Sequence, residues 1–319
     1  MLLPKNERRN IQKIEKKVIW MYGSPFSGKT TFANKFPDPL MLNTDGNIKF
    51  VDAPYIAIRD KVEANGRLAP KRTFAWAMFK EVIEELEKKD NDFKTIIVDL
   101  LEDCYEHCRL YMYDQMNITH ESDDSFRAWD KVMTEFLSTL KKLMNLDYEN
   151  IILISHEDTS KDITKKGGDK ITAIKPNLRE KVANKVAGMV DIVARVIADG
   201  DVRTLSFKTN EVIFGGGRLT VSTNEIPLDY DAFLEVYEEA NKNAVAELSG
   251  EKPAASASTE RKGRKKKEEP AEPAPKEEPQ EETEPADAEP KEEIKEEPQE
   301  EHTEQEAPKT RKTRKKRGE

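Results

Sequence analysis

Residues 23–30 match the pattern G-x-x-x-x-G-K-[ST], and this match limits the folds open to the chain more than any other stretch. An apolar run at residues 18–22 precedes it, and residues 31–36 can continue it as a helix. A strand, a glycine-rich loop and a helix in this order form the setting in which the pattern binds phosphate. The sequence therefore predicts a phosphate-binding loop, or P-loop, in an α/β protein. The alternative is a chance match in an unrelated strand-turn-helix unit.

Each residue type in this loop has a chemical task. Gly23 and Gly28 permit backbone angles closed to other residues, so successive N–H groups can surround the α- and β-phosphates. Lys29 is expected to reach the β- and γ-phosphates, and the Thr30 hydroxyl to bind Mg²⁺. The expected nucleotide-binding residues are Gly23, Ser24, Pro25, Phe26, Ser27, Gly28, Lys29, Thr30 and Thr31.

The composition divides the chain into a globular part and a charged tail. Toward the C-terminus large apolar residues almost disappear, and Glu, Lys, Pro and Ala dominate. Such a segment cannot bury enough apolar surface to offset its chain entropy. We expect an N-terminal leader over 1–16, one domain over 17–249 and a disordered tail over 250–319. The basic clusters at 261–267 and 311–317 serve either as solubilising charge or as a tether to nucleic acid or a partner.

Charge and hydropathy limit the partners and the compartment. The formal net charge is -9, so any nucleic-acid contact must come from a local basic segment rather than from a global field. The first residues form no long apolar segment, which argues against a signal peptide or a membrane anchor. The two cysteines, Cys104 and Cys108, are expected to be reduced thiols. We therefore expect a cytoplasmic protein with no membrane partner.

Apolar runs alternate with helical patterns along the domain. Continuous runs at 18–22, 94–99 and 151–156 are typical of central strands covered on both faces, and shorter extended pieces lie at 40–43 and 55–58. Their alternation with helices favours βαβ units and a mainly parallel sheet flanked by helices. The expected helices cover residues 29–36, 73–89, 100–116, 125–146, 178–189 and 230–248.

Two later segments depart from this alternation. Residues 191–197 and 202–207 flank a turn and are expected to pair as an antiparallel edge hairpin. Residues 157–176 are polar, with a hairpin turn expected at Gly167 and Gly168. The sequence therefore predicts a sheet whose parallel centre has an antiparallel margin.

Asp99 ends one of the apolar strands, about seventy residues after Lys29. A carboxylate in this position fits the group that holds Mg²⁺ through water, although an Asp there can also simply cap the next helix. Leu100 follows it, so the Asp-Glu pair of many ATPases is absent. The group that activates water for hydrolysis must therefore come from elsewhere.

Asp45 is the leading candidate for that group. It lies in the turn at 42–46, where the sequence resembles the RecA/Rad51-like recombinase ATPases, whose corresponding strand ends in a turn that carries the catalytic glutamate. An Asp is one methylene shorter, so the resemblance implies slow hydrolysis or the use of Glu102 instead. A plain role for Asp45 in the turn is the alternative.

His156 stands where the same resemblance places a polar sensor at the end of the next central strand. It could bond a γ-phosphate oxygen, or it could be a surface residue after a strand. In recombinases the loop that follows contacts single-stranded DNA, and here a solvated hairpin is the alternative. The resemblance implies DNA contacts by lysines of this loop: Lys161, Lys165, Lys166, Lys170 and Lys175.

The order of these motifs, together with the Lys-Pro-x-Leu-Arg segment at 175–179, resembles phage-encoded RecA-like ATPases that work beside single-strand annealing systems. The resemblance covers about residues 15–220. It implies a RecA-like domain that uses ATP and Mg²⁺, is stimulated by single-stranded DNA, forms homo-oligomers, and meets an annealing or single-strand-binding protein. Arg179 and Lys181 would act across a subunit interface as a trans finger. A small-molecule or nucleotide kinase and a non-hydrolysing scaffold are the alternatives.

Overall fold

The described part of the chain contains the whole expected domain except short gaps. The computed structural model describes residues 6, 16–65, 68–119, 126–160, 162–164 and 170–249. Most of the expected leader, the expected tail over 250–319, and Lys161, Lys165 and Lys166 lie outside the described residues. All described residues belong to one unit of the chain, residues 1–257. None of its described helices is both long and apolar enough to span a membrane.

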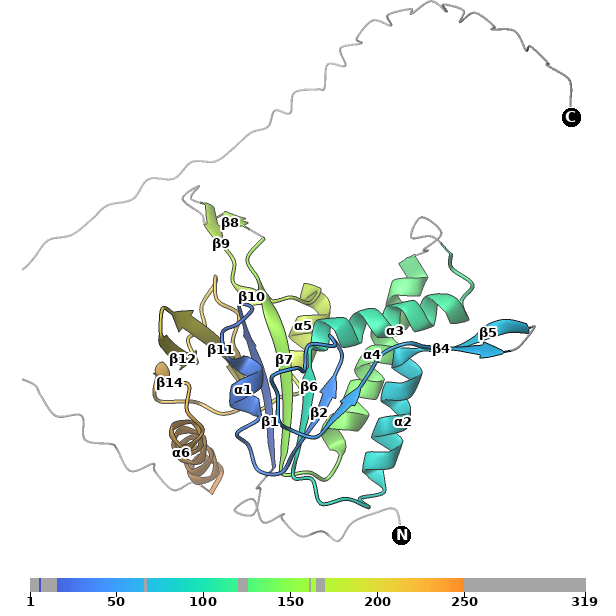
Figure 1. Ribbon diagram of the computed structural model, residues 1–319. Helices are drawn as coiled ribbons and strands as arrows, with labels where there is room; N and C mark the ends of the chain where they lie inside the picture. The colour runs from blue at the N-terminus through green and yellow to red at the C-terminus, as the bar shows by residue number, and fades with distance from the viewer. Residues whose placement is uncertain are drawn as a thin grey trace, which may run out of the picture. The chain divides into compact units, whose positions relative to one another are not determined.

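A ten-stranded sheet forms the centre of this unit (Figure 1). Its main path is β14-β12-β11-β1-β7-β6-β2-β3. The strands from β11 to β3 pair in parallel, whereas β12 and β14 pair antiparallel at one margin. The bounds are β1 Lys17–Gly23, β2 Pro39–Asn43, β3 Tyr55–Ala57, β6 Thr95–Asp99, β7 Asn150–Asp158, β11 Ile192–Asp199, β12 Val202–Ser206 and β14 Glu225–Pro227. The predicted α/β class with a mainly parallel sheet is confirmed.

The remaining strands are short additions. Two of them pair antiparallel with long strands of the sheet: β10 Lys175–Pro176 with β7, and β13 Gly216–Gly217 with β11. The others form separate two-stranded hairpins: β4 Lys61–Asn65 with β5 Leu68–Thr73, and β8 Asp162–Thr164 with β9 Lys170–Thr172. The β4–β5 hairpin was not predicted, because its strands are mostly polar and lack an apolar face.

Strand β1 lies between β7 and β11 and carries the P-loop at its carboxyl end. Its side chains alternate between two apolar cores: Trp20 and Tyr22 belong to one, Ile19 and Met21 to the other, and all four are fully buried. A strand covered on both faces needs apolar residues at every position, which accounts for the unbroken apolar run in the sequence.

The helices form one layer on each face of the sheet (Figure 1). Helices α1 and α6 supply the core on one face, and α2 to α5 supply it on the other. The bounds are α1 Lys29–Ala33, α2 Ala75–Glu87, α3 Leu101–Gln115, α4 Phe126–Asn145, α5 Glu180–Ala187 and α6 Tyr230–Ser249. The predicted helices are therefore present, with ends shifted by a few residues.

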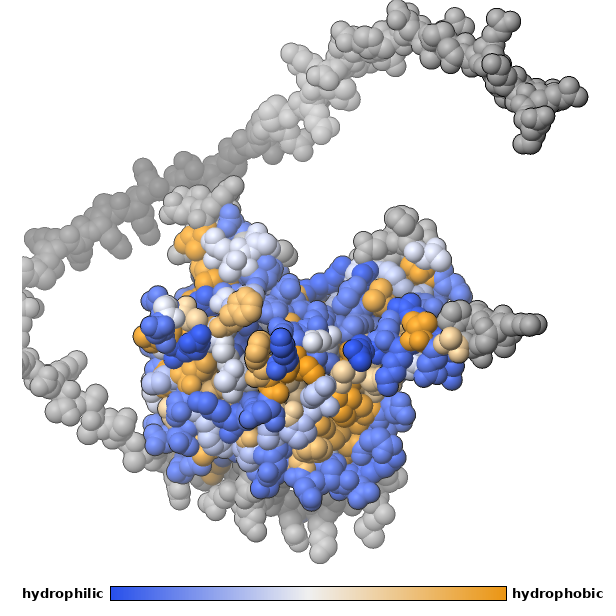
Figure 2. Space-filling view, in the orientation of Figure 1, coloured by the Kyte–Doolittle hydropathy of each residue, from blue (hydrophilic) through white to orange (hydrophobic). Residues whose placement is uncertain are grey.

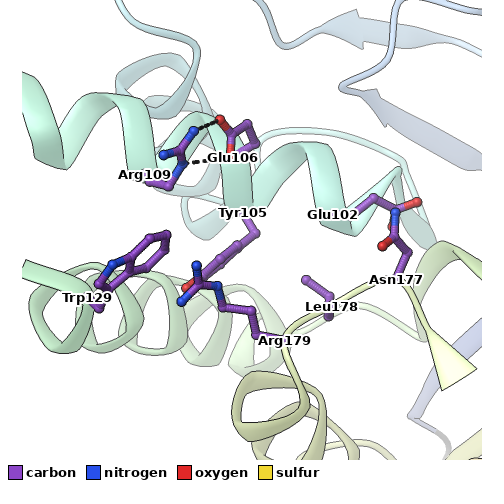
Figure 3. Close-up of a pocket in the computed structure, with 8 residues that line it drawn as sticks. All are labelled: Glu102, Tyr105, Glu106, Arg109, Trp129, Asn177, Leu178 and Arg179. Carbon is purple, nitrogen blue, oxygen red and sulfur yellow. Dashed lines mark hydrogen bonds and ion pairs between the residues drawn. The ribbon is translucent and has the colours of Figure 1, made fainter. Parts of the chain in front are cut away.

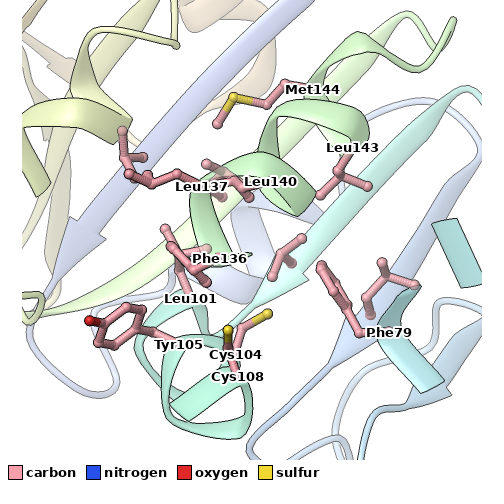
Figure 4. Close-up of a cluster of buried hydrophobic side chains, with 14 of the residues drawn as sticks. Phe79, Leu101, Cys104, Tyr105, Cys108, Phe136, Leu137, Leu140, Leu143 and Met144 are labelled. Carbon is pink, nitrogen blue, oxygen red and sulfur yellow. The ribbon is translucent and has the colours of Figure 1, made fainter. Parts of the chain in front are cut away.

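The larger core is built where α2, α3 and α4 meet (Figure 4). Its aromatic rings pack closely: the centroids of Tyr105 and Phe136 are 4.9 Å apart. Cys104 and Cys108 lie in this core as free thiols, and burial raises the pKa of both. They are therefore protonated at neutral pH and act as small apolar side chains.

The antiparallel pair expected at 191–197 and 202–207 is present as β11 and β12. Strand β11 also pairs in parallel with β1, and β14, which was not predicted, pairs with β12. Only β11 therefore separates β12 from β1, the strand that carries the P-loop. This position brings a β12 side chain to the site described below.

Candidate functional site

Two glycines in the P-loop are required by the geometry. A Cβ on Gly23 would lie 2.3 Å from the Val196 carbonyl oxygen, because β1 and β11 approach closely there. Gly28 has a φ of 95°, in the left-handed region that side chains disfavour. The loop therefore has its shape only with glycine at both positions.

Lys29 is held across the inside of this loop. Its side chain is buried, and Nζ donates to the carbonyl oxygens of Gly23 (2.9 Å) and Ser24 (2.7 Å). Burial lowers the pKa of Lys29, and the charges of Asp99 and Glu102 oppose that effect. A phosphate in the loop would give this ammonium group a charged acceptor in place of two neutral ones.

Thr30 and Asp99 meet beside Lys29, although 69 positions separate them. The Thr30 hydroxyl donates to Asp99 Oδ2 at 2.8 Å. Asp99 is 4% exposed, and burial raises its pKa to about 6, against the hydrogen bond from Thr30. Hard oxygen ligands suit Mg²⁺, and a divalent cation would stabilise the ionised form of this buried carboxylate. The pair therefore fits the magnesium site that the sequence predicts.

The turn that carries Asp45 is fixed to the residue after Asp99. Thr44 Oγ1 donates to the Leu100 carbonyl oxygen (2.7 Å) and accepts from the Leu100 N–H (2.6 Å). The peptide between Asp99 and Leu100 is cis. These contacts hold the end of β2 against the end of β6, so the two carboxylates lie on the same side of the sheet.

A cavity of about 780 Å³ joins these groups. The predicted residues that line it are Pro25, Phe26, Gly28, Lys29, Thr30, Thr31, Asp45, Asp99 and His156. Gly23, Ser24 and Ser27 belong to the loop behind it, and within the described residues the buried Ser27 hydroxyl has no hydrogen-bond partner. We call this space the nucleotide cavity.

Two exposed phenyl rings stand at the nucleotide cavity. Phe26 is 90% exposed and Phe50 is 92% exposed, and both belong to its lining. Figure 2 shows hydrophobic residues reaching the surface in the middle of the viewed face, among hydrophilic ones. Aromatic rings in this position provide apolar surface against which a bound ligand or another chain can pack.

Asp45 is bonded as a turn residue and also belongs to the lining of the nucleotide cavity. Its Oδ1 accepts from Asn43 Nδ2 (2.7 Å) and from the Asn47 N–H (2.8 Å), which is the bonding of a turn residue. It also lines the nucleotide cavity opposite the P-loop residues. The turn therefore positions this carboxylate and leaves it in contact with the cavity.

Glu102 does not line the nucleotide cavity but contacts a residue that does. Glu102 Oε1 accepts from the His156 N–H (2.7 Å) and lies 3.0 Å from His156 Nδ1. This pair could not be predicted from the sequence, because a helix start and a strand end 54 positions apart share no motif. Glu102 therefore holds His156 in place.

Arg203 is a cavity residue that the sequence analysis missed. It comes from β12, and its Cδ lies 3.1 Å from the point where a Cβ on Gly28 would be. It brings a guanidinium to the nucleotide cavity beside Lys29 and Lys35. Only the strand order places it there, so no spacing in the sequence could have revealed it.

The expected DNA-contact lysines are described only in part. Lys170 begins β9, and Lys175 Nζ lies 4.0 Å from Asp158 Oδ2 with its side chain 12% exposed. Of the expected trans-finger residues, Lys181 is exposed on α5, whereas the Arg179 guanidinium lies 3.3 Å from the ring centroid of Trp129. The DNA and trans-finger roles of these residues stay predictions.

Comparison with known proteins finds similarities of three kinds, to a family, to a curated protein and to a solved structure. A family described as an AAA domain matches residues 15–219. The SPbeta prophage-derived protein YorG of Bacillus subtilis (strain 168) is 27% identical over 168 residues, which are 50% of this chain and 47% of that protein. The chain thus spans about half the length of that relative. A crystal structure of the RadB recombinase aligns with 61% of this chain and 82% of its own, at 13% identity and a TM-score of 0.31.

Proposed function

The chain belongs to the AAA domain family, and on that premise we propose that it binds ATP with Mg²⁺, hydrolyses ATP, and couples its nucleotide state to single-stranded DNA in phage recombination or replication. One observation carries the proposal: the P-loop, Asp99, Asp45 and His156 converge on a single cavity. These residues come from the ends of four parallel strands, where open α/β sheets bind their ligands.

Each of these groups matches a requirement of phosphoryl transfer. Lys29 would bind the β- and γ-phosphates, while Thr30 and Asp99 would hold Mg²⁺, which neutralises charge on the phosphates. His156, which Glu102 fixes, would donate a hydrogen bond to a γ-phosphate oxygen. Lys29 and Asp99 are buried, which strengthens their interactions because water screens them less.

We assign the positioning of the attacking water to Asp45 rather than Glu102. Asp45 lines the nucleotide cavity, whereas Glu102 lies outside its lining and bonds His156. A general base must lie within hydrogen-bond reach of the water that it activates. We propose that Asp45 meets that condition once a nucleotide occupies the cavity, and we expect a slow reaction because its side chain is one methylene shorter than that of Glu.

Strand β7 supports the proposed coupling to single-stranded DNA. The strand passes His156 at the nucleotide cavity and continues to Asp158, and Figure 1 draws β8 and β9 beyond its end. The lysine-bearing segment is thus an extension of the strand that would sense the γ-phosphate. We propose that nucleotide binding orders this segment on DNA and favours a homo-oligomer, with an annealing or single-strand-binding protein as partner. The prophage origin of YorG supports the phage setting.

The test is the rate of phosphate release from ATP with Mg²⁺, measured on the full chain with and without single-stranded DNA. We expect a slow basal rate that rises several-fold with the strand, and retardation of the strand in a gel. A rate unchanged by DNA, together with no retardation with or without ATP, would refute the DNA part of the proposal. No ATP binding at all would refute the whole.

A further inference from the structure

A second pocket of about 320 Å³ lies beside the nucleotide cavity, between α3, α4 and the segment that leads into α5 (Figure 3). We call it the helix pocket. Its lining includes two arginines, Arg109 and Arg179, and two aromatic residues, Tyr105 and Trp129. No residue of the P-loop lines it, although Glu102 and Arg179 do, which the sequence offered as candidates for catalysis. From its chemistry we propose that the helix pocket binds an unpaired base of single-stranded nucleic acid, an inference that rests on the proposed DNA binding.

The stacked pair of Arg179 and Trp129 is the first observation behind this proposal. The guanidinium carbon of Arg179 lies 3.3 Å from the Trp129 ring centroid. Within the described part of the chain Arg179 makes no ion pair, and Arg179 is exposed to solvent. A guanidinium that stacks on an aromatic ring with one face offers its other face to a base and its N–H edge to a phosphate.

The second arginine, Arg109, lies on the opposite side, where its charge is paired with that of Glu106. Figure 3 shows Arg109 above the pocket, joined to Glu106, with Tyr105 between it and Arg179. The charges of both arginines act on the Tyr105 hydroxyl, whose pKa burial raises. An aromatic floor with cations at its margin is the arrangement that binds a base together with its backbone phosphate.

An independent observation points to a ligand at the inner end of the helix pocket. Glu102 also lines this pocket, and its side chain is 10% exposed. Its Oε1 is bonded to His156, but within the described residues the buried Oε2 has no hydrogen-bond partner. A buried acceptor without a donor is unfavourable. The amino or imino N–H of a base would satisfy it.

A single residue, His156, connects the helix pocket with the nucleotide cavity. Glu102 and Asn177 line the helix pocket, and both bond His156: the first through Oε1, the second through its N–H to the His156 carbonyl oxygen at 2.8 Å. His156 lines the nucleotide cavity. A base that moves Glu102 therefore acts directly on the residue that faces ATP, and linkage makes the effect reciprocal.

Trp129 provides a direct readout on the full chain. Trp20 and Trp76 are fully buried, so quenching of tryptophan fluorescence by bases reports Trp129. The probes are a single-stranded DNA oligonucleotide and an abasic strand of the same length, without nucleotide. We expect the base-bearing strand to quench the fluorescence and to bind at least about fivefold more tightly than the abasic strand, given the usual strength of base stacking. Trp129→Phe should abolish the quenching.

Arg179→Ala tests the stacked arginine against a matched control. Arg72→Ala also removes an arginine that stacks on a ring, since its guanidinium lies 4.3 Å from the Phe74 centroid, but it lies outside the pocket lining. We expect Arg179→Ala to weaken the base-bearing strand at least about fivefold and to leave the abasic strand nearly unchanged, with Arg72→Ala neutral for both.

The outcomes separate this inference from the proposed function. If the unaltered chain binds both strands equally, or if the two arginine variants behave alike while DNA is still bound, the helix pocket is not a base site and the proposed function stands. If the unaltered chain binds neither strand without nucleotide, this inference is overturned, and the DNA part of the proposed function is overturned with it only if the strand is not retarded with ATP either. Since no nucleotide is present, a trans-finger role of Arg179 in catalysis cannot produce the expected pattern.

Discussion

The nucleotide cavity and the helix pocket are neighbours that share contact with His156, yet they are built in different ways. The first is centred on eight consecutive residues, 23–30, whose backbone forms the binding surface. The second is made of side chains from three separate segments, on α3, on α4 and before α5. A site made by a local backbone shape can be recognised from the sequence, whereas a site made by side chains from distant segments appears only when the helices are packed.

The largest effect should follow from the residue that is most specific to the nucleotide cavity. Lys29→Ala removes the buried ammonium that would bind two phosphates, and each such contact contributes about 1.5–3 kcal/mol. We expect ATP affinity to fall at least about 100-fold, measured by titration calorimetry with Mg²⁺. Lys35→Ala, an exposed lysine of the same cavity, is the control and should cost far less. Equal losses in the two variants would mean that the P-loop is not the binding surface.

Asp45→Asn and Glu102→Gln compare a residue that lines the nucleotide cavity with one that lines the helix pocket. Asp45→Asn keeps the size of the side chain but removes the charge that orients water, so we expect turnover to fall about 100-fold with ATP affinity retained. Glu102→Gln should lower turnover less, because Glu102 acts through His156. Single-turnover hydrolysis with saturating ATP measures both. A larger loss of turnover in Glu102→Gln than in Asp45→Asn would mean that Glu102 positions the attacking water, and it would contradict the assignment of Asp45.

Arg203→Ala tests a part of the nucleotide cavity that was hidden in the sequence. The change removes one cation beside Gly28, and we expect about tenfold weaker ATP binding. Arg203→Lys keeps the positive charge and should therefore retain part of the ATP affinity that Arg203→Ala loses. Arg218→Ala, an exposed arginine bonded to the Gly188 carbonyl oxygen and outside the cavity lining, is the control. If Arg203→Ala binds ATP as tightly as the unaltered chain, Arg203 and strand β12 do not contribute to ATP binding.

The smallest effect should appear in the helix layer that carries the helix pocket. Glu135 on α4 accepts from Trp76 Nε1 (3.1 Å) and Lys80 Nζ (3.0 Å). Burial raises its pKa, but these two bonds outweigh burial and the pKa is lowered from its ordinary value of 4.5. Glu135→Gln should reduce the free energy of unfolding by about 1 kcal/mol at neutral pH, with ATP affinity unchanged.

The sign of the pH dependence follows from the lowered pKa of Glu135. The ionised carboxylate contributes to the free energy of unfolding when the pH is above its pKa in the unfolded chain. This contribution is lost as the pH falls through its pKa in the folded chain. The difference in unfolding free energy between Glu135→Gln and the unaltered chain should therefore shrink below pH 4.5, as denaturant titrations at several pH values would measure. A constant difference down to pH 3 would contradict the role given to the ionised carboxylate.

The same contrast explains how much could be predicted from the sequence. The P-loop, the strands that carry Asp99 and His156 near their carboxyl ends, and the α/β fold with a mainly parallel sheet were predicted, because apolar runs mark buried parallel strands whose carboxyl ends meet at one edge. The β4–β5 hairpin and β14 were missed, because their strands are short and have few apolar residues. Arg203, the bond between Glu102 and His156, and the helix pocket depend on packing between segments, which leaves no local pattern.

The position of β1 also sets an order of events during synthesis. The strand that carries the P-loop precedes the other described strands along the chain, but its two neighbours are β7, which begins at Asn150, and β11, which begins at Ile192. Pairing across such long stretches of chain is slow, because the intervening loop must be closed first. A nascent chain that ends before β7 holds every residue of the P-loop but neither neighbour of β1. We therefore expect ATP to be captured only after β7 and β11 have been made and have paired with β1.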